Sequence, residues 1–245
     1  MKSKGKIAAL SALVLLAVCL SVLLPYGVQR YRDQQQIGVA HLRETPLEQQ
    51  LSAPPLSVFD KLRLLSGGEA AVVSTGNMYT EAEIKVQCTA ELKLLYDGGV
   101  LTQNPGEVPW MQQTATAALL LGVDDSAQGM ILWTVNFSSD TVLAQCGIDD
   151  ETGKILYLYA ANFEGASPVI SEEQIHGLAA YWGAAVSSES RQQSSFTPAA
   201  ISLPQGDSFQ NDYQYLFSWD DAELTIHAAE TTHGIFLGHN LLLPQ

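Results

Sequence analysis

A short basic stretch followed by a long uncharged run opens the chain. Lys2, Lys4 and Lys6 precede residues 7–24, which contain no charged side chain. In a helix this run spans roughly 27 Å at about 1.5 Å per residue, enough to cross the hydrocarbon core of a bilayer. Because flanking lysines stay on the cytoplasmic side, the pattern predicts a cytoplasmic tail at 1–6, a single transmembrane signal anchor at 7–24 and an extracytoplasmic remainder.

Two other interpretations of the run compete with the anchor. A cleaved signal peptide needs small residues at a cleavage site after the apolar core, and residues 21–26 contain no such pair. A lipoprotein signal would carry its lipid on Cys19, and residues 16–19 resemble one. However, Val18 stands where such a signal has a small residue before the cysteine. The uncleaved anchor is therefore the favoured prediction.

The next stretch is polar and broken by prolines. Residues 25–55 are rich in glutamine and show no apolar stripe, a composition typical of a stalk. The spacing of Leu56, Phe59 and Leu62 then predicts a short helix, which Gly67 and its neighbour end. Folded structure is therefore expected from about Leu56 onward.

Two further helices are predicted by the same local signal. Residues 80–83 and 171–174 are capping boxes, in which a hydroxyl accepts from the N3 amide and the N3 side chain bonds back. Each box leads directly into an isoleucine. Apolar residues at helical spacing follow: Ile84, Cys88, Leu92 and Leu95 in the first helix, and Ile175, Leu178, Ala179, Trp182 and Val186 in the second.

Strand patterns follow each of these helices. Turn residues separate three alternating or apolar runs in each half of the chain, which predicts two antiparallel meanders. The pattern predicts an α+β fold with two helix-strand-strand-strand units, at 56–165 and 166–245. Residues 100–129 contain an apolar run that fits either helix or strand. The predicted strands cover 130–137, 141–148 and 154–159 in the first unit, and 213–219, 223–228 and 234–237 in the second.

The last hairpin of the first unit carries a short motif, Asp149-x-x-Thr152-Gly153. In such a turn the glycine adopts positive φ and the aspartate bonds the turn backbone. With this motif, residues 79–160, and more faintly 170–238, resemble a PepSY-type domain. The plan is also similar to that of the YycI/YycH-type regulators, single-pass proteins whose PepSY-like ectodomains restrain a cell-wall sensor kinase. The resemblance implies a regulatory role and carries over no catalytic residue.

Charge narrows the class of partner. The chain has 12 Lys and Arg against 26 Asp and Glu, a net charge of −14. The three lysines of the predicted tail are excluded from the exported part, which is therefore more acidic still. Such a surface repels nucleic acid and anionic lipids. The expected partners are the membrane, through the anchor, and another membrane or envelope protein.

Candidate chemistry is sparse. The chain has no phosphate-binding loop, zinc-protease motif, Cys-x-x-Cys or nucleophile elbow. His227, His233 and His239 recur every six residues; they are either a metal site or, as we favour, solvent-facing turn histidines. No catalytic residue, metal or cofactor is predicted. Three acidic clusters lack the alternating ligands of a calcium loop and are interpreted as turn residues: Asp124–Asp125, Asp149–Glu151 and Asp220–Asp221.

Two cysteines of the exported part are candidates for a disulfide. Cys88 lies on the apolar face of the first capped helix, and Cys146 lies on the expected core face of the middle strand. A helix packed across that sheet brings the two faces together, and an extracytoplasmic compartment permits oxidation. A disulfide and two buried free thiols both remain open.

Four aromatic residues form a candidate interaction surface. Tyr213, Tyr215, Phe217 and Trp219 alternate along one predicted strand and therefore share one face. They form either a peptide-binding surface or the core face beneath the helix that carries Trp182. The core interpretation is favoured, because that helix needs an apolar sheet to cover it.

These patterns together predict a bacterial, single-pass, membrane-anchored extracytoplasmic module that binds and regulates a membrane partner, such as a sensor kinase or a protease, without catalysis. The alternatives are an extracytoplasmic hydrolase whose site is assembled from scattered residues, and a structural component of an envelope assembly. An exposed apolar patch or unpaired sheet edge would favour binding. A deep pocket with convergent histidine and carboxylate groups would favour the enzyme.

Overall fold

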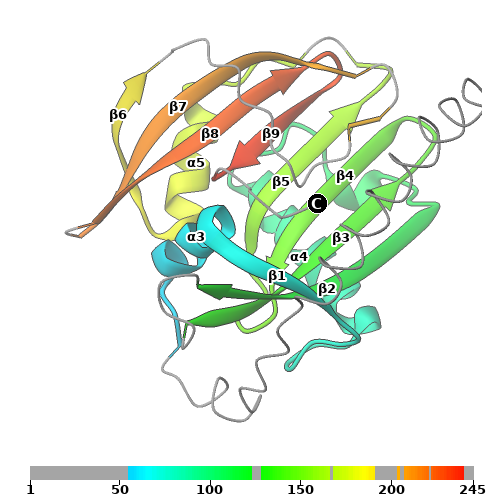
Figure 1. The fold of residues 1–245 in the computed structure, drawn as a ribbon. Helices are drawn as coiled ribbons and strands as arrows, with labels where there is room; N and C mark the ends of the chain where they lie inside the picture. The colour runs from blue at the N-terminus through cyan, green and yellow to red at the C-terminus, as the bar shows by residue number, and fades with distance from the viewer. Residues whose placement is uncertain are drawn as a thin grey trace, which may run out of the picture. The chain divides into compact units, whose positions relative to one another are not determined.

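One antiparallel sheet organises the described part of the chain in this computed structural model (Figure 1). Its nine strands lie in the order β1-β2-β3-β4-β5-β9-β8-β7-β6. The meander β1–β5 and the meander β6–β9 meet at their last strands, where Leu158 lies opposite Leu237. The bounds are β1 Gly68–Val73, β2 Gln112–Gly122, β3 Gly129–Ser138, β4 Val142–Asp149, β5 Ile155–Asn162, β6 Ala185–Ser190, β7 Phe209–Trp219, β8 Ala222–Thr231 and β9 Gly234–Gly238.

The structure describes residues 55–122, 128–165, 168–190, 203–204, 207–220 and 222–239. These ranges do not include the predicted tail at 1–6 or the predicted anchor at 7–24, which contains Cys19. They include only the last residue of the predicted stalk at 25–55. Within them, no helix has the length and apolar character needed to span a bilayer.

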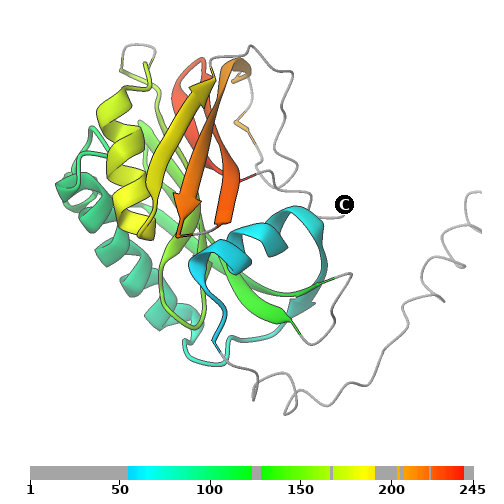
Figure 2. The ribbon, with the colours of Figure 1, turned by 90° about the vertical axis from the view of Figure 1, so that its left-hand side faces the viewer.

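Three α-helices lie on the two sides of the described sheet. α4 (Glu81–Asp97) and α5 (Glu172–Trp182) cover one face, and α3 (Val58–Gly67) lies on the other side (Figure 2). α3 contacts β2, β5 and β8. A short 3-10 helix, η1 (Pro105–Glu107), lies in the loop between α4 and β2. The predicted α+β class with helices on antiparallel structure is confirmed, but the strands form one continuous sheet and not a separate sheet for each predicted unit.

Both predicted capping boxes are present. The Thr80 hydroxyl accepts from the Glu83 amide while the Glu83 side chain accepts from the Thr80 amide, and Ser171 and Gln174 make the same exchange. α5 ends earlier than predicted, because Gly183 takes a left-handed φ of 71°. Val186, which the apolar spacing placed on this helix, therefore lies in β6.

The expected number of strands after each helix is wrong. Each helix precedes four strands instead of three: α4 precedes β2–β5, and α5 precedes β6–β9. β2 is the run that fitted either helix or strand, and pairing with β1 and β3 makes it a strand. β6 was missed because its sequence, Ala-Val-Ser-Ser-Glu-Ser, lacks an apolar pattern. Only its pairing with β7 stabilises it as a strand.

The aromatic row of β7 belongs to the core. Tyr215 and Phe217 are buried, and the Phe217 ring lies 5.9 Å from the Trp182 ring of α5. Trp219 Nε1 donates to the Trp182 carbonyl oxygen at 3.2 Å, whereas Tyr213 is half-buried. The sheet face beneath α5 uses this row to bury the helix's apolar side, so Tyr215 and Phe217 are not accessible as an interaction surface.

Candidate functional site

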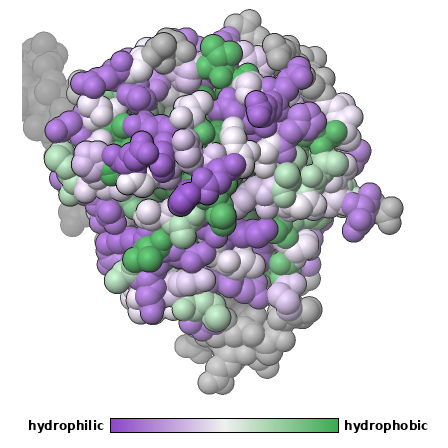
Figure 3. All heavy atoms as spheres, turned by 180° about the vertical axis from the view of Figure 1, so that it is seen from behind, coloured by the Kyte–Doolittle hydropathy of each residue, from purple (hydrophilic) through white to green (hydrophobic). Residues whose placement is uncertain are grey.

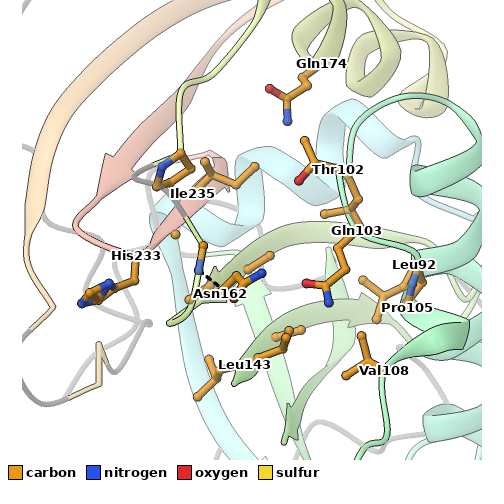
Figure 4. Close-up of a pocket in the computed structure, with 18 of the residues that line it drawn as sticks. Leu92, Thr102, Gln103, Pro105, Val108, Leu143, Asn162, Gln174, His233 and Ile235 are labelled. Carbon is orange, nitrogen blue, oxygen red and sulfur yellow. Dashed lines mark hydrogen bonds between the residues drawn. The ribbon is translucent and has the colours of Figure 1, made fainter. Parts of the chain in front are cut away.

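A pocket of about 270 Å³ opens on the face that carries α4 and α5 (Figure 4). Ala144, Ala160 and Ile235 lie side by side on β4, β5 and β9 and form its floor. Leu92 of α4 and Gln174 of α5 contribute to the walls, together with the loop that follows α4. The site therefore lies over the central strands, where the two meanders meet.

Small floor residues and the helix spacing create this space. Two residues along each strand, the corresponding row on the same face is Cys146, Leu158 and Leu237. There Cys146 and Leu158 are larger than the two alanines, and all three side chains are buried. α4 and α5 approach closely at Gly177, where an added Cβ would lie 2.5 Å from the Gly98 carbonyl oxygen. The alanine floor therefore leaves a hollow beside this close contact of the two helices.

A buried polar contact also fixes α5 against α4. The Tyr181 hydroxyl donates to a Glu91 carboxylate oxygen and accepts from the Ile155 amide at 2.8 Å. Burial, reinforced by the Glu91 carboxylate, raises the pKa of Tyr181. The hydroxyl therefore stays protonated and donating, which holds the helix layer in place above the pocket floor.

The loop after α4 is held rigidly over the pocket. The Asn104 side chain caps η1 by accepting from the Gly106 amide at 3.0 Å. Trp110 Nε1 donates to the Pro105 carbonyl oxygen at 3.1 Å, and the Trp110 ring lies 5.3 Å from the buried Phe137 ring. These contacts fix the loop on both sides of η1, so the wall it forms is preorganised.

Three amide side chains line the pocket, and they differ in how many of their hydrogen-bonding groups are already paired. Gln174 is committed, because its Nε2 donates to the Val100 carbonyl oxygen at 2.8 Å and its Oε1 accepts from the Ser171 amide. Asn162 Oδ1 accepts from the Gly165 amide at 3.1 Å. The Gln103 side chain points toward the middle of the pocket (Figure 4) and makes no hydrogen bond to any described residue.

The pocket is uncharged, but its frame is acidic. None of the described residues that line it is Asp, Glu, Lys or Arg. The surrounding segments, 98–111, 139–143, 162–173 and 231–235, contain five acids and no Lys or Arg. Those five side chains are all exposed: Glu107, Asp140, Glu164, Glu172 and Glu173. Each of these acids lies within two residues of a residue that lines the pocket, so the loops and the helix start beside the neutral lining carry negative charge.

The outer surface of this side is mostly polar, with separate apolar patches (Figure 3). Val169, at the edge of the pocket, is 77% exposed. Such an exposed valine extends the apolar surface of the pocket outward to solvent.

The three histidines do not come together as a site. His227 lies in β8, buried, with its Nδ1 3.2 Å from Asp212 Oδ1, so the interpretation as a solvent-facing turn residue is wrong for it. His233 is a turn residue at the pocket, and its ring points away from the other labelled side chains (Figure 4). His239 Nδ1 lies 2.7 Å from the Thr225 carbonyl oxygen, and burial together with nearby His227 lowers its pKa.

In the part of the chain that the structure describes, no group of three or more His, Cys, Asp or Glu side chains is placed to hold a metal ion. The acids at 124–125 and at 221 lie outside that part.

The Asp149 turn has a role that the sequence did not reveal. Its predicted local chemistry is confirmed: Asp149 Oδ2 accepts from the Thr152 amide at 2.9 Å, and Gly153 has a φ of 69°. In addition, the buried Lys61 of α3 lies 2.7 Å from Asp149 Oδ2 and 2.6 Å from Glu151 Oε2. These acids are therefore structural partners of α3, and no pattern in the sequence linked them to Lys61.

Cys88 and Cys146 are buried free thiols in the structure, and they interact with each other. Burial raises the pKa of Cys88 well above its usual value, and the neighbouring Cys146 adds to this shift. Because thiolates are the reactive form, this shift protects Cys88 from reagents in solution while the fold is intact, and Cys146 is shielded by its burial.

The disulfide therefore stays a prediction with a direct test. Protein isolated from its native cells with thiols blocked on lysis should show no alkylation of Cys88 or Cys146 after unfolding, unless it is reduced first. Intact mass with and without reduction, followed by peptide mapping, measures this. Full alkylation without reduction would establish two free thiols instead.

Comparison of the chain with models of protein families, with curated proteins and with solved structures gave no match.

Proposed function

We propose that this protein is a membrane-anchored extracytoplasmic binding module that regulates a membrane partner, such as a sensor kinase or a protease. The predicted anchor at 7–24 confines it to the cell membrane as a single-pass protein, with the described fold outside. The observation that carries the proposal is the preorganised, uncharged pocket in a chain whose net charge is −14. A solvent-open apolar hollow on an otherwise acidic protein is typical of a recognition site.

The order of elements supports a further part of the proposal. We propose that α4 with β2–β5, and α5 with β6–β9, are two PepSY-like units that share one sheet. Both helices open with a capping box, both precede four-stranded meanders, and the units meet at β5 and β9. The pocket lies at this junction, so its shape depends on both units at once.

The pocket also bears on the alternative functions. A hydrolase would place a nucleophile, a base and polar stabilising groups around one reacting atom. The described lining contributes only one titratable side chain, His233, and its ring points away from the other labelled side chains (Figure 4). An apolar, amide-lined hollow is better suited to binding than to proton transfer, which favours the interaction module over the enzyme.

The test is site-specific photocrosslinking of the full-length protein in its native membrane. A photoreactive residue replacing Gln103 at the pocket should capture a membrane or envelope protein, and one replacing the exposed Glu223 of β8 should not. Ala160→Leu, which fills the floor, should abolish the crosslink and the complementation of a deletion strain. Replacing the anchor with a cleavable signal should reduce both, because confinement to the membrane raises the effective concentration of the partner.

Two results would contradict this function. A deletion strain fully complemented by the folded Ala160→Leu variant would show that the pocket is dispensable. Turnover of a substrate by the purified full-length protein, lost on a single substitution that leaves the fold intact, would establish the enzyme.

A further inference from the structure

We infer that the pocket takes one large apolar side chain from an extended peptide segment of a partner protein, with Lys or Arg on either side of that residue. This inference rests on the proposed function and names the chemistry of the bound segment. It is carried by the size of the pocket, its hydrogen-bonding groups and the charge around it.

The size of the pocket limits the occupant. Pockets for drug-sized ligands and cofactors measure roughly 300–1,000 Å³, and this one measures about 270 Å³. Its floor is built from Ala144, Ala160 and Ile235, and Leu92 and Val108 add apolar walls. That volume suits a single leucine-sized or aromatic side chain together with the backbone that carries it.

The hydrogen-bonding groups favour a peptide over an anionic amphiphile. The Gln103 side chain offers both a donor and an acceptor, which is the pair that a peptide N–H and C=O require. Asn162 retains its Nδ2 donors beside the pocket, since its hydrogen bonds with the Glu164 and Gly165 amides engage only Oδ1. A fatty-acid carboxylate would need a cation, and no Lys or Arg is among the described lining residues.

The charges around the pocket define what flanks the bound side chain. Glu107, Asp140 and Glu164 come from different loops, and Glu172 and Glu173 begin α5, so each segment that carries these acids also contributes residues to the pocket lining. Exposed charges of one sign raise the local concentration of an oppositely charged segment and speed its association. The segment is therefore basic at both flanks, and an acidic segment binds more weakly.

The direct test is peptide binding to the full-length protein in nanodiscs of zwitterionic phosphatidylcholine. The probe is a fluorescein-labelled, amidated heptapeptide with a central leucine, glycine spacers and two lysines on each side, followed by fluorescence anisotropy. Replacing the leucine by alanine should weaken binding about 30-fold, the loss expected for a buried leucine side chain. Replacing the lysines by glutamates should weaken it at least about tenfold in low salt, and less at 500 mM salt because of screening.

Variants of the protein locate the binding. Ala160→Leu should lose at least about tenfold in affinity for the leucine peptide, and Gln103→Ala about fivefold through its lost hydrogen bonds. Gln103 is exposed, so its substitution leaves the fold intact even if Ala160→Leu disturbs it. Ala71→Leu, an exposed site on β1 away from the pocket, is the matched control and should not change affinity.

The outcomes separate this inference from the function on which it rests. Equal affinity for the leucine and alanine peptides, or for the lysine and glutamate peptides, overturns the inference. So does leucine-peptide binding that Ala160→Leu and Gln103→Ala leave unchanged. If either result occurs while the Gln103 crosslink to a membrane partner still depends on Ala160, the binding module stands and its ligand is of another chemistry. If either result occurs and the Gln103 crosslink does not depend on Ala160, the binding module is overturned as well.

Discussion

Replacing Lys61 by methionine is expected to lower the free energy of unfolding by about 3–5 kcal/mol. The Lys61 and Asp149 side chains are each only 1% exposed, and their charges lie 2.7 Å apart. Asp149 Oδ1 has no hydrogen-bond partner among the described residues. The buried carboxylate is therefore stabilised only by the hydrogen bonds and the ion pair that Oδ2 accepts. Methionine fills similar space without a charge, which leaves Asp149 buried with the Thr152 contacts alone.

A matched control separates burial from charge. Lys93→Met removes a lysine that also forms an ion pair, 2.6 Å from Asp97, but there both partners are at least half exposed. Such a pair contributes less than about 1 kcal/mol. Urea unfolding followed by tryptophan fluorescence measures both variants, since all four tryptophans lie in the described fold. Equal, small losses for the two variants would show that the Lys61 pair does not hold α3.

The Lys61 contact also attaches α3 to the sheet. α3 directly follows the predicted stalk, and its buried lysine joins it to the turn that ends β4. Loss of the Lys61 contact therefore weakens the attachment of α3 to this turn.

Asp150→Asn is expected to cost about 3 kcal/mol, because two hydrogen-bond donors lose their acceptor. One Asp150 oxygen accepts from the Asn77 and Met78 amides at 2.7 and 2.8 Å. The other accepts from Trp133 Nε1 at 2.8 Å and from the Tyr79 amide at 3.3 Å. Asparagine has only one acceptor oxygen, so its amino group must face two donors.

The control and the readout for Asp150 follow from its geometry. Asp140→Asn makes the same chemical change at an exposed turn and should alter stability by less than about 0.5 kcal/mol. The Asp150 variant should also change the near-UV circular dichroism, because Trp133 loses its fixed partner. The backbone at Gly76 packs directly against the Asp150 carboxylate, since an added Cβ there would lie 2.0 Å from Asp150 Oδ1. The side chain at position 150 therefore has little room to move to another position. Identical unfolding curves for the two variants would contradict the prediction.

Features that depend on neighbours in sequence were predictable. The capping boxes join residues three apart, the Asp149–Thr152 contact closes one turn, and β3, β4 and β5 alternate or run apolar between clear turns. In each case the interacting groups are brought together by local backbone geometry, so residue types and spacing suffice. The α+β class follows from these local signals.

Features that depend on distant residues were decided by tertiary structure alone. Lys61 and Asp149 are 88 residues apart, and nothing local to either predicts the pair. The pocket arises because strand register places Ala144 beside Ala160 and Ile235 beneath two helices, and each of these residues alone is an ordinary strand residue. β6 became a strand only through its hydrogen bonds to β7. By itself the sequence determined the local elements and their class, and long-range pairing and packing, which no local pattern encodes, created the single sheet and its pocket.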